Sequence, residues 1–163
     1  MKKVFCILLA LPLLLASCAA APSPLAYQDG TERVACTLAV GGGTYKAEII
    51  PGEALIIIEP EELSGVTFSV TDGKYTLSSG GTALELPDDL VPLITPVVGA
   101  FSLPADDAKT STSGDDTRVV KVKSDGGEYE IKLSPDGTPA EISYKGVREF
   151  VMYGITLTAD AGE

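Results

Sequence analysis

The chain has 163 residues, the length of one domain, with 12 Lys and Arg against 23 Asp and Glu and a formal net charge of −11. This charge makes nucleic acid and anionic headgroups poor partners, so a basic-patch function is excluded. The sequence contains no His, which excludes Ser-His, Cys-His and His-metal chemistry.

The first 17 residues are typical of an export signal. Lys2 and Lys3 precede a run from residue 4 to 16 in which only Pro12 is not apolar. Thirteen helical residues span roughly 20 Å, which is short of the ~30 Å core of a bilayer. We therefore predict a signal peptide at 1–17, whose removal takes both lysines and leaves 10 basic and 23 acidic residues, a net charge of −13.

Leu15-Ala16-Ser17-Cys18 resembles the lipobox of bacterial lipoproteins. The resemblance implies that Cys18 receives a diacylglycerol, becomes the first residue after cleavage and often carries a further acyl chain such as palmitate on its amine. Two or three chains would anchor the protein stably to the cell membrane, facing the extracytoplasmic side. Ordinary secretion is the alternative, because Ala19-Ala20-Ala21 also offers a cleavage site.

The cysteine pattern leaves Cys36 without an intramolecular partner once Cys6 departs with the signal and Cys18 is acylated. A Cys18–Cys36 bridge would require a retained, unacylated Cys18. Cys36 is in line with Val34 and Leu38 on one strand face, so we predict a buried core thiol rather than a reactive one.

Residues 18–32 lack periodicity and carry Pro and Gly, so we expect the lipidated Cys and a flexible tether there. From residue 33 to 159 the apolar residues alternate with period two, which predicts a β domain of nine or ten strands. Turns are predicted at 41–43, 51–52, 72–73, 80–81, 125–127 and 135–137.

The period changes between residues 88 and 102, where one helical face is apolar. Asp88 or Asp89 can cap the start, and Pro96 should kink or restart this helix. Residues 105–117 are polar and aperiodic, which predicts a mobile surface loop. The predicted fold class is mainly β (α+β), a large curved antiparallel sheet or half-open barrel packed on one kinked amphipathic helix.

No catalytic or metal site is predicted. No Ser has Lys three positions on, Gly-x-Ser-x-Gly does not occur, and the paired acids lack the spacing of a calcium loop. We therefore expect no enzyme activity, no metal and no cofactor.

Two segments, 55–58 and 150–157, are apolar at successive positions. A half-solvated sheet needs only one apolar face. The second face could belong to a simple core, line a ligand cavity or meet another protein.

The segments 58–68, 71–75 and 136–142, with the helix near 88–102, resemble the LolA/LolB-like group, and the layout is similar to small uncharacterised lipoproteins of Firmicutes. The resemblance implies a half-open β-barrel with helices over its mouth and an apolar cavity that can take acyl chains. We expect a non-enzymatic, membrane-anchored protein that binds a lipid or other hydrophobic ligand between sheet and helix. The predicted cavity lining is Leu55, Ile57, Phe68, Leu93, Val97, Phe101, Phe150 and Met152. The alternative is an envelope scaffold with a filled core and an unknown protein partner.

Overall fold

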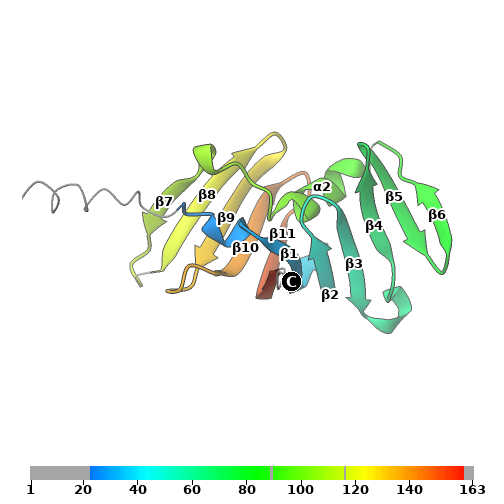
Figure 1. Cartoon of the computed structure of the whole chain (residues 1–163), viewed down its shortest axis with the longest axis horizontal. Coiled ribbons are helices and arrows are strands. Elements are labelled where there is room, and N and C mark those ends of the chain that lie inside the picture. The colour runs from blue at the N-terminus through cyan, green and yellow to red at the C-terminus, as the bar shows by residue number, and fades with distance from the viewer. Residues whose placement is uncertain (1–22, 89, 116, 160–163) are drawn as a thin grey trace, which may run out of the picture.

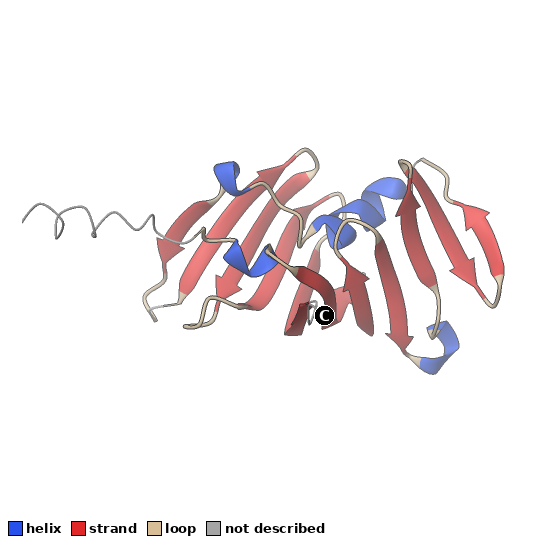
Figure 2. Cartoon of the chain, in the orientation of Figure 1, coloured by secondary structure: helices blue, strands red, loops and turns tan. Residues whose placement is uncertain are grey.

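The computed structural model describes residues 23–88, 90–115 and 117–159; the predicted signal peptide and Cys18 lie outside these ranges. The described chain is one curved, unclosed antiparallel sheet of eleven strands with an α-helix against it (Figures 1 and 2). The predicted fold class is thus confirmed. No helix within these ranges has the length and apolar character needed to cross a bilayer.

The strands are β1 (Thr31–Val40), β2 (Gly43–Ile50), β3 (Ala54–Glu59), β4 (Thr67–Thr71), β5 (Lys74–Ser79), β6 (Thr82–Glu85), β7 (Lys109–Thr112), β8 (Arg118–Ser124), β9 (Gly127–Leu133), β10 (Pro139–Gly146) and β11 (Phe150–Ala159). The helices are α2 (Val91–Gly99) and three short 3-10 turns, η1 (Ala26–Gln28), η2 (Glu61–Leu63) and η3 (Ala105–Asp107).

The strand order is β6-β5-β4-β3-β2-β1-β11-β10-β9-β8-β7. The chain therefore starts in the middle of the sheet, meanders outward to the β6 edge, crosses back through α2 to the β7 edge and meanders inward until β11 pairs with β1 (Figure 1). Because α2 belongs to the crossing segment, it lies over the sheet between its two halves.

One strand was missed in the sequence. Lys109–Thr112 forms the edge strand β7 inside the segment expected to be a mobile loop, paired from Thr112↔Arg118 to Lys109↔Lys121. All four residues of β7 are exposed, so no apolar alternation marks the strand. Its Thr-Ser-Thr content favours extended backbone, and the neighbouring β8 supplies the pairing.

The core covers the concave face of the sheet. In β1 the inward residues Val34, Cys36 and Leu38 lie directly opposite β2 residues in register and are 0–6% exposed. Inward residues of β8 to β11 continue the same layer beneath α2 and the segment that follows it. Cys36 is buried as predicted, and burial raises the pKa of its thiol to about 11.

A β-bulge changes which side chains of β11 face the concave side. Ala35 pairs with Thr156 and Thr37 with Tyr153, so Cys36 alone faces two residues of β11. Gly154 has φ +60°, which a glycine adopts without the cost that a Cβ would add. The extra residue reverses the alternation after the bulge, whereas Val151 and Tyr153 lie on the opposite face before it, so this strand carries apolar side chains on both faces only in its first half. Apolar side chains stay on the concave side before and after the bulge: Phe150, Met152, Ile155 and Leu157.

The folded domain begins before residue 33. Leu25 is 3% exposed, and the Tyr27 ring meets Phe101 edge-on at a centroid distance of 6.3 Å. β1 itself starts at Thr31. The last residues of the expected tether therefore pack on the concave side, where η1 lies across the sheet (Figure 2).

The helix is shorter than predicted. It runs from Val91 to Gly99 as a single helix, so the two-piece alternative is wrong, and Leu90, without a side-chain cap, takes the position expected of an Asp. Pro92 occupies the first turn, where its missing N–H costs nothing. Pro96 lies inside the helix and removes one interior hydrogen bond.

Candidate ligand-binding site

A partly open cavity of about 310 Å³ lies between α2 and the concave side of strands β1 to β4. Its wall is aliphatic and aromatic except for one charged side chain. The lining residues are Leu38, Val40, Tyr45, Leu55, Ile57, Leu63, Val66, Phe68, Ile94, Val97 and Arg148.

Strand register explains the floor of this cavity. Leu55 lies opposite Phe68, and the Ile57 amide donates to the Val66 carbonyl at 2.9 Å. Cross-strand partners point to the same face, so these four side chains form a continuous apolar surface. Ile57 is 6% exposed, which shows how far this floor is withdrawn from bulk solvent.

Ile94 and Val97 form the roof, one helical turn apart on the same side of α2. The sheet holds the end of this helix through two backbone carbonyls. Tyr129 Oη donates to Pro96 O at 2.8 Å, and Gly52 N donates to Val98 O at 3.1 Å. These carbonyls belong to the last turn, which has no helical donors of its own.

A third contact joins the roof to β5. The Thr95 and Tyr75 hydroxyls are hydrogen-bonded to each other, with Oγ1 and Oη 3.1 Å apart. Burial raises the pKa of Tyr129 above its ordinary value of 10.0. The roof is therefore fixed from the β9 side, from the β2–β3 turn and from β5.

The structure separates the predicted lining residues into three groups. Leu55, Ile57, Phe68 and Val97 lie together on the cavity wall. Phe101, Phe150 and Met152 are buried elsewhere in the core, 0–3% exposed, and do not line this cavity. Leu93 is in α2, and its side chain is outside the described set.

The packing of the three core residues explains this difference. The Phe150 ring stacks on Tyr144 at 5.3 Å, and Phe101 packs against the Tyr27 ring. Met152, directly opposite Leu38 in the register, is fully buried. Each side chain already has protein neighbours where a ligand would have to lie.

Several lining residues were missed: Leu38, Val40, Tyr45, Leu63, Val66, Ile94 and Arg148. Leu38 and Val40 do alternate inward along the first strand, and that signal was available. Nothing in the sequence distinguishes Arg148, because it lies in a turn and reaches the cavity only through the pairing of β11 with β1.

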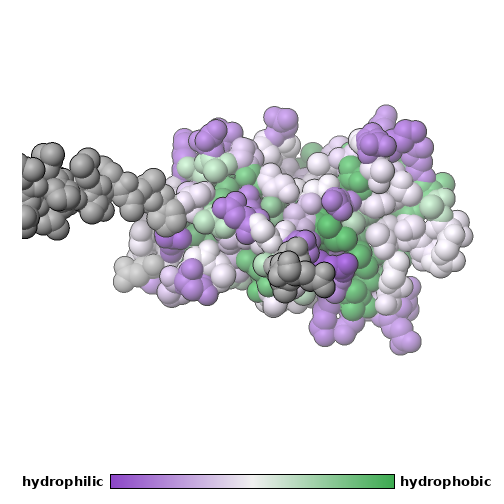
Figure 3. Space-filling model, in the orientation of Figure 1, coloured by the Kyte–Doolittle hydropathy of each residue, from purple (hydrophilic) through white to green (hydrophobic). Residues whose placement is uncertain are grey.

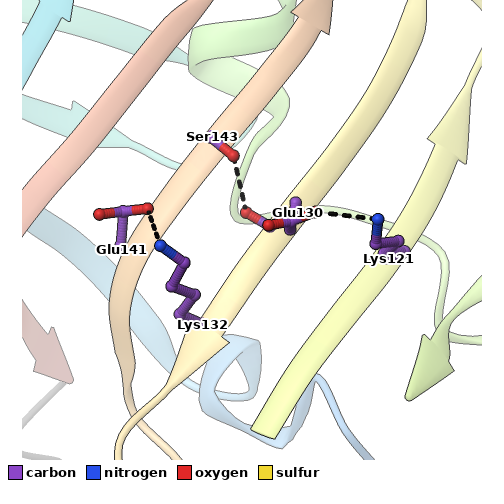
Figure 4. A network of polar contacts seen from close by, with 5 residues as sticks. All are labelled: Lys121, Glu130, Lys132, Glu141 and Ser143. Atoms are coloured by element: carbon purple, nitrogen blue, oxygen red, sulfur yellow. Dashed lines mark hydrogen bonds and ion pairs between the residues drawn. The ribbon is translucent and has the colours of Figure 1, made fainter. Parts of the chain in front are cut away.

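The convex face of the sheet carries charged side chains that are exposed to solvent. On β8 to β10, Lys121 Nζ lies 2.9 Å from the Glu130 carboxylate and Lys132 Nζ lies 2.8 Å from Glu141, while Ser143 Oγ donates to the Glu130 carbonyl at 3.4 Å (Figure 4). The Lys121 hydrogen bond lowers the pKa of Glu130. These pairs are exposed and contribute little stability, but they keep this face charged and wet.

Residues 23–88, 90–115 and 117–159 hold no group of three acidic or Cys side chains placed to bind a metal ion. The raised pKa of Cys36 keeps its thiol protonated. On the face shown in Figure 3, apolar side chains gather over β3 and its neighbours.

No protein-family model matches the chain, and no curated protein matches it. Among solved structures, a LolA superfamily protein from Nitrosomonas europaea is 11% identical, with 85% of this chain and 94% of that one covered and a TM-score of 0.42. An uncharacterized conserved protein from Thermus thermophilus is 10% identical, with 83% and 84% covered and a TM-score of 0.42. Lipoprotein LppX of Mycobacterium tuberculosis is 13% identical, with 88% and 99% covered and a TM-score of 0.40. At these values, nothing about function transfers to this chain.

Proposed function

We propose that this protein is a non-enzymatic binding protein that holds the apolar chain of a lipid or similar hydrophobic ligand between α2 and the concave side of the sheet. The cavity of about 310 Å³, apolar on every side but one, is the observation that carries the proposal. Its volume lies at the lower end of the ~300–1,000 Å³ range of ligand sites. Apolar cavities of this kind offer water few hydrogen bonds and accept apolar ligands.

The site would work close to a membrane. We propose that Cys18 is the acylated anchor, on the extracytoplasmic side of the cell membrane. Leu25 is buried in the domain, and six residues separate it from Cys18, so the seven Cα–Cα steps between them span at most ~25 Å when extended. The cavity would then stay within reach of lipids in the same bilayer.

Ligand binding is tested by filling the cavity. Ile57→Phe places a larger side chain on the cavity floor, whereas Ile56→Phe places it on the opposite face of the same strand. With the full chain carrying Cys18→Ser, we expect Ile57→Phe to weaken binding of the uncharged fluorescent probe N-phenyl-1-naphthylamine at least tenfold and Ile56→Phe to leave it unchanged. Circular dichroism and thermal unfolding confirm that both variants fold.

Native mass spectrometry of the wild-type protein from its own membrane gives an independent test, since a co-purifying lipid is expected. If the wild-type chain binds no probe and carries no lipid, the proposal fails. Capture of one protein partner by crosslinking in the same cells would then favour a scaffold with a filled core.

A further inference from the structure

Arg148 is the charged residue on the cavity wall, the single one among the described residues. It lies in the turn between β10 and β11, residues 147–149. Val40 pairs with both Phe150 and Gly43, so this turn lies beside the β1–β2 turn, at the end of the cavity where Tyr45 also contributes its ring. A guanidinium and a phenol therefore border the same end of an otherwise apolar space.

Within the described part of the chain, Arg148 has no internal partner. The ion pairs of the described residues are Arg33–Glu48, Lys46–Glu59, Lys121–Glu130 and Lys132–Glu141, and none of the side-chain hydrogen bonds found among those residues involves Arg148. The neighbouring Glu149 borders a separate hollow around the β1–β2 turn. Other described basic residues, such as Lys109 and Arg118, also form no ion pair, so what sets Arg148 apart is its place on the cavity wall.

We propose, on the basis of the function proposed above, that the cavity selects a single-chain amphiphile with an anionic head, a carboxylate or phosphate that bonds to Arg148. The guanidinium fork presents paired N–H donors that match such a head in geometry. The chain then lies over Ile57 and Phe68, beneath Val97. The acidic net charge of the chain disfavours adsorption to anionic surfaces. Inside the cavity, however, no carboxylate of the described residues lines the wall, so an anionic head would meet only the positive charge of Arg148.

The cavity volume fits one short apolar chain. A methylene group takes about the space of one water in the liquid, ~30 Å³, so the cavity accommodates about ten methylenes. A second chain of the same length would need twice the volume of about 310 Å³ that the structure offers. Longer single chains would leave through the open side.

The test compares three ligands that share a twelve-carbon chain: dodecanoate, dodecyl phosphate and dodecanol. Each displaces N-phenyl-1-naphthylamine from the full chain carrying Cys18→Ser, at pH 8. We expect the two anions to bind about tenfold more tightly than the alcohol, the size of one charge-assisted hydrogen-bond pair. A preference for only one of the anions identifies the head as carboxylate or phosphate.

Arg148→Gln should remove this preference and leave dodecanol affinity within twofold. Arg33→Gln is the matched control, because Arg33 is another exposed arginine, paired with Glu48 and absent from the cavity wall. The inference is overturned if wild-type protein binds dodecanol as tightly as the anions, or if Arg148→Gln weakens all three ligands equally. Failure of the proposed function looks different, since the probe itself would not bind.

Discussion

The isoleucines Ile57 and Ile142 allow a matched test of whether the cavity exists in solution. Both point to the concave side and are buried, 6% and 0% exposed. Ile57 borders the cavity, whereas Ile142 lies in β10 between Ile131 and Met152 in the register and is packed on all sides. The same change, Ile→Ala, removes three carbons at each site.

At Ile142 the cost has two parts. The lost transfer free energy is about 2.4 kcal/mol at ~0.8 kcal/mol per carbon group. Three groups of ~30 Å³ each leave a new void of about 90 Å³, which adds about 2 kcal/mol at ~24 cal/mol per Å³. We therefore expect Ile142→Ala to lower the free energy of unfolding by about 4 kcal/mol.

Ile57→Ala should cost about 2 kcal/mol, half as much. One side of the Ile57 side chain already faces empty space, so fewer dispersion contacts are lost and the cavity grows instead of a new one forming. Urea unfolding of both variants, with the ligand removed first, measures the difference. Equal losses at the two sites would mean that the wall closes around Ile57 in solution, and the reasoning would be refuted.

Three further predictions concern groups that hold the fold. Tyr129→Phe leaves the Pro96 carbonyl without its donor and should cost about 1–2 kcal/mol in urea unfolding; a change below ~0.3 kcal/mol would show that water replaces the hydroxyl. Burial raises the pKa of Cys36 to about 11 and of Tyr27 to about 12, from ordinary values of 9.0 and 10.0. Between pH 9 and 12 the unfolded chain therefore loses protons that the folded chain keeps, so the free energy of unfolding should fall as the pH rises. Cys36→Ala should make this fall less steep below pH 11. An unchanged dependence of the unfolding free energy on pH in the variant would contradict this. Gly154→Ala should lower stability by about 1–2 kcal/mol because alanine must adopt φ +60°, and an unchanged melting temperature would show that the bulge relaxes.

Much of the fold was predictable because most strands bury one face only. Alternation of Val34, Cys36 and Leu38 predicted the central strand and the burial of the thiol. The missed edge strand β7 buries nothing, so no period in its sequence could reveal it. In β11 the bulge at Gly154 reverses the alternation, so a strict period of two assigns Ile155 and Leu157 to the wrong face.

The cavity was predictable only in part. Leu55, Ile57 and Phe68 could be found because a strand pattern shows which side chains share a face. Phe101 and Phe150 could not be separated from them, because ring stacking with partners distant in the chain decides whether a buried residue meets protein or empty space. Arg148 depends on the pairing of the first and last strands, which no local pattern encodes.

The existence of the cavity follows from a mismatch of lengths. Eleven strands spaced ~4.8 Å apart make a sheet about 48 Å wide, whereas the nine residues of α2 span only ~14 Å. Residues 100–103 and η1 extend the cover toward β8 and β9, where inward side chains are fully buried. On β4 to β6 no comparable segment of the described chain follows, and inward residues there remain partly exposed, up to 63% at Leu84. Because the nine residues of α2 and the segment after it cover only part of this wide sheet, the apolar space on the β4 side stays partly open.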